Sequence, residues 1–334
     1  MDVAPWIWIV TIVVIVAMLA VDYVGHVRTP HAPTLKESAI WSAAYVAVAV
    51  VFGFIVLAVW GGTYGGEYFA GYITEKSLSV DNLFVFVLIM TSFRVPREHQ
   101  QRVLLIGITI ALVLRTIFIF VGAALIENWA WIFYIFGAFL IWTAISQARA
   151  GTGHEEEYSE NGILRLTRKI FPTTDDYVEH HMVTKIDGKR YITPMLIVMI
   201  AIGSADLLFA VDSIPAIFGL TQETYLVFTA NAFSLLGLRQ LYFLVDGLLD
   251  RLVYLNYGLA AILGFIGIKL VIHALHTNEV PFINGGEHVE AIPEISTMVS
   301  LSFIVVVLTI TTLASLAKTR HDKKVAESTG SESA

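Results

Sequence analysis

The feature that most constrains this chain is a series of apolar runs, each about 20 residues long, that recur over nearly its whole length. Such a run is long enough to cross the hydrocarbon core of a bilayer, which is about 30 Å thick, as an α-helix. Hydrophobic residues make up 56% of the chain and charged residues only 15%, whereas soluble domains average about 25% charged residues. The pattern therefore predicts an all-α, polytopic membrane protein with the lipid bilayer as its surroundings.

Nine runs qualify as transmembrane helices. The first carries only Asp2 as a flanking charge and no cleavage motif, so we expect a retained helix and not a signal peptide. The predicted spans are 6–24, 39–60, 68–93, 103–126, 129–149, 194–219, 225–248, 252–273 and 297–317.

The loops alternate in charge. Every second connection, together with the C-terminal tail, holds 17 of the 21 lysines and arginines, and the other connections hold none. By the positive-inside rule this predicts an N-terminus outside and a C-terminus in the cytoplasm, with 61–67 and 274–296 outside and 150–193 inside. The net charge of −7 argues against nucleic acid as a partner. Without cysteine, disulfides, thiolate metal sites and cysteine nucleophiles are excluded.

Two stretches place carboxylates inside predicted spans with one spacing. In "EKSLSVDNLFVF" Glu75 precedes Asp81 by six residues, and in "DLLFAVDSIPAIF" Asp206 precedes Asp212 by six. The following spans also correspond, since "LRTIFIFVG" from Leu114 resembles "LRQLYFLVDG" from Leu238 with one inserted residue. This alignment pairs two arginines, Arg115 and Arg239.

Spans three to five therefore resemble spans six to eight. Because three is an odd number, the two units enter the membrane from opposite sides, and we predict an inverted-topology repeat, which is typical of secondary transporters. The predicted organisation is two helices over 1–60, a first three-helix repeat over 61–149, a cytoplasmic loop over 150–193, a second repeat over 194–273, an outer loop and last helix over 274–317, and a disordered tail over 318–334.

Buried carboxylates are costly in lipid and usually mark ion pathways. Four of them with two arginines sum to −2, which one divalent cation would neutralise. Carboxylate, amide and hydroxyl oxygens are hard ligands that suit Mn²⁺, Mg²⁺ or Ca²⁺. The candidate metal ligands are Glu75, Asp81, Asn82, Asp206, Asp212 and Ser213.

Regular helices would not bring all four carboxylates together, since those of each motif lie about 120° apart around a helix axis. We expect local unwinding at the glycines of 61–71, at Gly203 and at Pro215 to make convergence possible. We also expect Arg115 and Arg239 to pair with these acids. A purely structural set of interhelical salt bridges stays open as the alternative.

These features predict a transporter and not an enzyme, moving a divalent cation outward by alternating access around a midplane carboxylate site. Proton counter-flow is a natural coupling, because carboxylates can exchange a metal for protons. No resident cofactor is expected. The alternatives are oxyanion handling, with tellurite held by Arg115 and Arg239, and a scaffold that binds cytoplasmic partners through the 150–193 loop.

The stretches "EKSLSVDN", "VLRTIFIF", "YIFGAFLIW", "FAVDSIPAIF" and "LGLRQLYFL" resemble the TerC family of integral membrane proteins, in its Alx-like branch. The resemblance covers nearly the whole membrane portion. It implies a bacterial cytoplasmic membrane protein of the LysE-like transporter superfamily, associated with manganese export and in some members with tellurite resistance. Family acidic positions carry over to Glu75, Asp81, Asp206 and Asp212. Many relatives have a glutamate where this chain has Gly203, so its metal preference or affinity could differ.

Overall fold

A computed structural model describes residues 1–27, 34–150, 182–186, 189–245, 253–281, 283–289 and 292–330. The elements are α1 (Pro5–Asp22) with a π-helical extension η1 (Tyr23–Val27), α2 (Leu35–Trp60), α3 (Gly62–Ser92), α4 (Arg97–Asn128), α5 (Ile132–Ala150), β1 (Val183–Ile186), β2 (Lys189–Ile192), α7 (Pro194–Phe218), α8 (Thr224–Leu235), α9 (Leu238–Val245), α10 (Leu255–His276), the 3₁₀ turn η3 (Asn284–Gly286) and α11 (Thr297–Gly330).

The prediction of an all-α, polytopic membrane protein is confirmed. Seven of the described helices, α1, α2, α4, α5, α7, α10 and α11, are long and apolar enough to cross a membrane. The other two predicted spans correspond to α3, which carries the first acidic motif, and to the pair α8 and α9.

Large apolar side chains cover the outside of the bundle. Ile9, Phe54 and Trp142 expose 63%, 57% and 65% of their surface and belong to α1, α2 and α5. Contiguous exposed apolar surface of this kind would be an aggregation hazard in water and is the expected surface of helices that face lipid.

Local sequence explains several helix boundaries. The Thr34 hydroxyl accepts a hydrogen bond from the Glu37 amide at 3.2 Å and so caps the start of α2. Pro194 opens α7 at a position where its missing N–H costs nothing. Gly61, with φ of +97°, turns the chain from α2 directly into α3, in a conformation that favours glycine.

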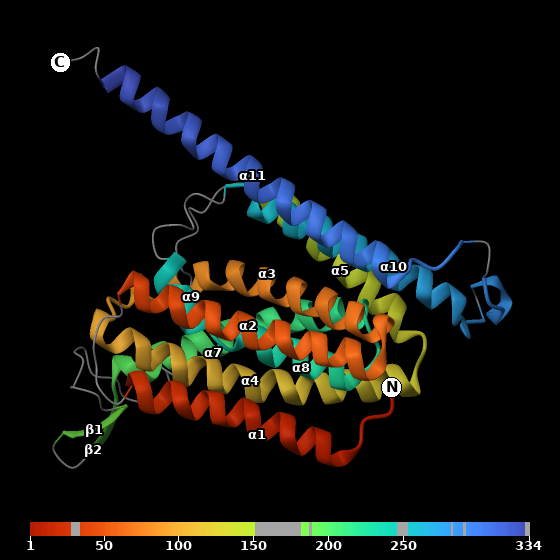
Figure 1. Cartoon of the computed structure of the whole chain (residues 1–334), viewed down its shortest axis with the longest axis horizontal. Coiled ribbons are helices and arrows are strands. Elements are labelled where there is room, and N and C mark those ends of the chain that lie inside the picture. Colours follow the sequence, from red (N-terminus) through yellow and green to blue (C-terminus); the bar gives the residue numbers. More distant parts are fainter. Residues whose placement is uncertain are drawn as a thin grey trace.

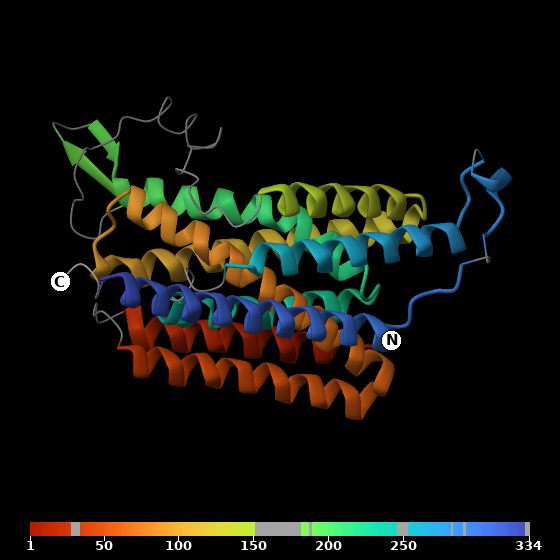
Figure 2. The same ribbon diagram turned by 90° about the horizontal axis from the view of Figure 1, so that it is seen from above.

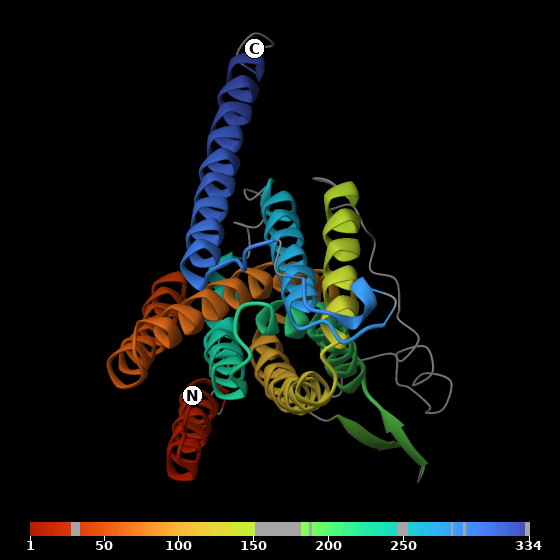
Figure 3. The same cartoon turned by 90° about the vertical axis from the view of Figure 1, so that its right-hand side faces the viewer.

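The bundle has two distinct ends. The antiparallel hairpin β1–β2 lies at one end, whereas the N-terminus and the segment that follows α10 lie at the other (Figures 1 and 2). We call the first the hairpin end. The helices α5, α10 and α11 are inclined to the remaining helices and rise away from them when the molecule is viewed along its long axis (Figure 3).

The helices of the two predicted repeat units pack mainly against helices of the other unit. The helix α3 packs chiefly against α8, α4 packs against α7, and α5 and α10 pack against each other. The α5–α10 contact is close because glycines face it, and a β-carbon on Gly137 would lie 2.9 Å from the Gly267 carbonyl oxygen. Small residues at such contacts let helices approach within a membrane.

Three sequence-based expectations differ from the structure. The helices α3 and α7 run unbroken through the glycines and through Pro215, so the acidic motifs are not unwound. The discontinuity lies instead between α8 and α9, where Leu236 is extended and Gly237 has φ of +79°. The tail is helical as far as Gly330, because α11 extends beyond its apolar part.

Candidate functional site

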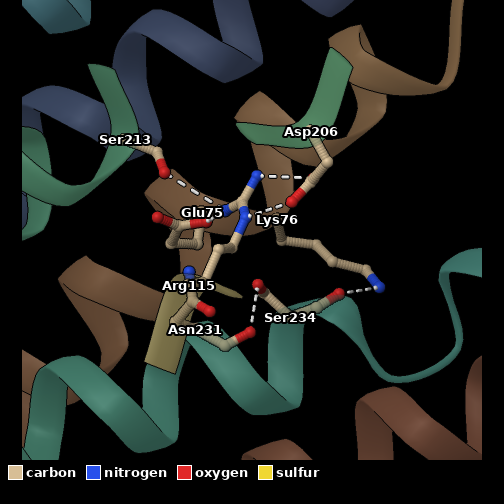
Figure 4. A network of polar contacts seen from close by, with 7 residues as sticks. All are labelled: Glu75, Lys76, Arg115, Asp206, Ser213, Asn231 and Ser234. Atoms are coloured by element: carbon tan, nitrogen blue, oxygen red, sulfur yellow. Dashed lines mark hydrogen bonds and ion pairs between the residues drawn. The ribbon is translucent and has the colours of Figure 1, made fainter. Parts of the chain in front are cut away.

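A buried arginine holds two acidic side chains together at the centre of the bundle (Figure 4). Arg115 of α4 is completely buried and donates through Nε and Nη2 to the two carboxylate oxygens of Asp206, each at 3.0 Å. Its Nη1 donates to Glu75 Oε2 at 2.8 Å and to Ser213 Oγ at 3.1 Å. The two-pronged contact with Asp206 is the strongest type of side-chain ion pair. The first acids of both motifs, from α3 and α7, therefore meet at one guanidinium.

Several buried polar atoms of the ion pair and of neighbouring residues have no hydrogen-bond partner. Within the described part of the chain they include Glu75 Oε1, Ser79 Oγ, Thr74 Oγ1 and both amide atoms of Asn231. The Asn231 side chain lies beside Glu75, in Figure 4, without hydrogen-bond geometry. Leaving a buried polar group unsatisfied costs about 1–3 kcal/mol. A cluster of them is typical of a place that binds ions or water.

The second acids of the motifs do not join Arg115. Asp212 is partly exposed and, with Asn82 and Ser213, lines a cavity of about 470 Å³ between α3, α5, α7 and α10. From α5 the same cavity receives Thr143 and Gln147. Asp81 directly precedes Asn82 on α3, but its side chain lies outside the described part of the structure.

The five predicted ligands whose side chains the structure describes are thus divided over two adjoining places. Glu75 and Asp206 lie at Arg115, while Asn82 and Asp212 line the cavity. Ser213 belongs to both, since its hydroxyl accepts from Arg115 and it also lines the cavity. Among the described side chains, no three histidines or carboxylates lie close enough to hold a metal ion by themselves.

Arg239, the second predicted charge-pairing residue, bonds a different acid. It donates to both carboxylate oxygens of Asp22, at 2.7 and 3.2 Å, and to Gln101 Oε1 at 2.7 Å. Gln240 also donates to Asp22 at 2.7 Å. The expectation that both arginines pair with motif acids is therefore wrong for Arg239. Asp22 is the last residue of α1 and is only 4% exposed.

Lys76 is a functional candidate that is not among the predicted site residues. Its ammonium donates to the backbone carbonyl of Ser234 at 3.0 Å, in the last turn of α8 before the break (Figure 4). Two signals in the sequence point to this contact. A lysine directly follows the first motif acid, and Gly237 interrupts a predicted span two residues before Arg239.

Comparisons with known proteins agree with this architecture. The model of the integral membrane protein TerC family matches residues 60–323. An uncharacterized membrane protein of Mycobacterium tuberculosis is 55% identical over 318 residues, which cover 94% of this chain and 80% of the relative.

More distant relatives match over similar lengths. A membrane protein of Myxococcus xanthus is 39% identical over 95% of this chain and 94% of its own length. The Escherichia coli protein Alx, whose name describes a membrane-bound redox modulator, is 41% identical over 80% of this chain and 86% of its own length. No solved structure matches the chain. On the family match and these identities, the chain belongs to the TerC family of integral membrane proteins.

Proposed function

We propose that this protein exports a divalent cation, with Mn²⁺ as the favoured substrate, from the cytoplasm through the two adjoining places described above. The observation that carries the proposal is the buried pair Glu75 and Asp206, which opens through Ser213 onto a cavity lined by Asp212. Ionisable groups at this depth in a membrane protein usually mark an ion route.

Charge balance favours a divalent ion. Glu75 and Asp206 carry −2, and Arg115 with the neighbouring Lys76 carries +2. Asp212 together with Asp81 then leaves −2, which one divalent cation neutralises. The carboxylate, amide and hydroxyl oxygens around the cavity suit a hard ion such as Mn²⁺.

The cavity is large enough to admit a hydrated ion at this point of the route. Six waters occupy about 180 Å³, at about 30 Å³ each, and the cavity holds about 470 Å³. The neutral side chains Asn82, Thr143 and Gln147 fit contacts to the waters of such an ion. Dehydration would follow nearer Glu75 and Asp206, whose exchange of metal for protons would supply the coupling.

The helix pairing supports an inverted repeat. Exchanging the two units turns the α3–α8 contact into the α7–α4 contact and leaves the α5–α10 contact unchanged, which is what a twofold relation requires. The placement of 61–67 at the end opposite the hairpin agrees with the predicted orientation (Figure 2). Alternating access by movement of one unit against the other is the mechanism such repeats use.

The alternatives have less support. Tellurite would have to displace carboxylates from both Arg115 and Arg239, which are already paired. A redox role, suggested by the name of the relative Alx, could not use a thiol, because the chain has no cysteine. Most of the 150–193 loop, on which a scaffold role and the predicted cytoplasmic partner depend, lies outside the described residues.

Transport by the purified protein in liposomes tests the proposal, with Mn²⁺, Mg²⁺, Ca²⁺, Zn²⁺ and tellurite compared at controlled pH. Asp212→Asn and Asp81→Asn keep side-chain volume and remove one charge each, so folding should be spared while Mn²⁺ binding weakens at least tenfold, about 1.4 kcal/mol. Asp2→Asn, on the exposed N-terminus, is the control and should transport normally. Wild-type Mn²⁺ flux in both Asp→Asn variants would refute the site.

A further inference from the structure

The break between α8 and α9 frees the backbone carbonyl of Ser234 from its helical hydrogen bond. In a continuous helix the Ser234 carbonyl would accept from the Leu238 amide, four residues on. Here Leu236 has ψ of 133° and Gly237 has φ of +79°, which turns the chain away before that bond can form in a regular helix. The Ser234 carbonyl instead receives the Lys76 ammonium at 3.0 Å.

The end of α8 is an electrostatically favourable place for a cation. Aligned peptide dipoles leave about half a negative charge at a helix C-terminus. In transporters with discontinuous helices, half-helix C-terminal ends and freed carbonyls coordinate Na⁺ or protons. α8 is a 12-residue helix that ends at this break.

Lys76 reaches this place from the same turn of α3 that carries Glu75. Its side chain extends away from Arg115 and toward the break, while Glu75 turns toward Arg115 (Figure 4). A charged lysine far from the membrane edges is expensive unless it is paired. Lys76 nevertheless binds a backbone carbonyl and does not pair with the adjacent Glu75. This choice of partner requires an explanation.

We propose that the break between α8 and α9 is a monovalent-cation site and that the Lys76 ammonium is its tethered occupant. An ammonium and an alkali ion carry the same charge and bind the same carbonyl oxygen. Tethering gives the lysine a high effective concentration, so dissolved ions cannot compete with it. The site should therefore accept Na⁺ or K⁺ once the ammonium is removed.

Lys76→Met is the direct test, because it removes the ammonium and retains most of the aliphatic bulk. Thermal unfolding of the purified protein would be measured in NaCl, KCl and choline chloride at equal ionic strength, which holds general screening constant. We expect the melting temperature of Lys76→Met to be about 5 °C higher in NaCl or KCl than in choline chloride, the size expected for a ligand well above its dissociation constant. The wild type should melt alike in all three salts.

Lys269→Met is the matched control. Lys269 also lies in a membrane helix, but it lines the cavity at the end opposite the hairpin and not the break. Its melting temperature should not depend on the choice of cation. Equal melting of Lys76→Met in the three salts would overturn the proposal and leave Lys76 as a helix-capping residue.

A second variant covers the case in which Lys76→Met does not fold in choline chloride. Lys76→Gln can still donate a hydrogen bond to the Ser234 carbonyl but supplies no charge, so it should fold in each salt and still gain stability from NaCl or KCl. An identical melting temperature in all salts would again overturn the proposal. The melting temperature is measured without a divalent cation, so a failure of Mn²⁺ transport in liposomes would not affect this test. Equally, a failure of this test would not affect the proposal of Mn²⁺ transport.

Discussion

Two arginines in matching sequence contexts hold two different kinds of cluster. Arg115 and Arg239 are both buried, and each grips an aspartate with two nitrogens. Arg115, however, gathers acids from α3 and α7, whereas Arg239 joins α9 to Asp22 at the end of α1. A residue repeated in two units can therefore bind the same kind of group in both and still have a different partner and a different role.

The clusters also differ in charge and in hydrogen bonding. Arg239 with Asp22 is neutral, and Gln101 and Gln240 each add one hydrogen bond to the pair, while Gln240 Oε1 has no hydrogen-bond partner among the described residues. Arg115 faces two carboxylates, and Glu75 Oε1 has no hydrogen-bond partner beside it. Two carboxylates at one arginine are suited to a site that exchanges ions. A neutral arginine–aspartate pair is suited to a structural contact between helices.

Replacing each arginine with glutamine should give the largest difference between the two clusters in the free energy of unfolding. Arg115→Gln leaves two buried carboxylates without their main partner, and removing one member of a buried pair costs about 3–5 kcal/mol. Arg239→Gln leaves one carboxylate, which still accepts from Gln240, so its loss should be smaller. Chemical unfolding in detergent micelles measures both.

The effect of Mn²⁺ on these variants sharpens the distinction. Added Mn²⁺ should restore part of the lost stability to Arg115→Gln, because the cation can replace the missing positive charge near Glu75 and Asp206. It should not help Arg239→Gln. Equal rescue of the two variants would erase the proposed difference between the clusters.

Replacing the aspartate of each cluster, Asp206 or Asp22, with asparagine should also distinguish the two clusters, by a smaller effect on Mn²⁺ binding. We expect Asp206→Asn to weaken Mn²⁺ binding about tenfold or more, about 1.4 kcal/mol, because it removes one carboxylate beside the ion route. Asp22→Asn should leave Mn²⁺ affinity unchanged, since Asp22 lies at Arg239. Mn²⁺ titration followed by electron paramagnetic resonance would reveal any reversal of this order.

The last prediction concerns the break between α8 and α9, after which Arg239 reaches Asp22 of α1. Gly237→Ala introduces a β-carbon 2.8 Å from that of Tyr45 and places alanine at positive φ, so we expect a loss of about 2 kcal/mol or more. Gly61→Ala also places alanine at a positive φ, but in open space, so it should lose only a backbone cost of about 1–3 kcal/mol. If Gly237→Ala melted like the wild type in thermal unfolding, the close packing at Tyr45 would not matter.

Apolar periodicity and length predicted nearly all the membrane helices, because crossing a bilayer sets a minimum apolar length that is visible in the residues themselves. The break in the span predicted over 225–248 was missed. Position 237 is glycine where the corresponding place before Arg115 is Val113, and this difference was visible in the sequence. A lone glycine in a helix is common, however, so only its packing against Tyr45 identifies it as a turn.

The sequence by itself determined the class of the protein, its long apolar helices and the acidic and basic residues buried in them, because each depends on local composition. The tertiary structure decided the partners. It placed Asp206 and Glu75 at Arg115, Asp22 at Arg239 and Lys76 at the Ser234 carbonyl. These contacts join residues 40 to 217 positions apart, and buried charges take whichever opposite charge helix packing brings within hydrogen-bonding distance.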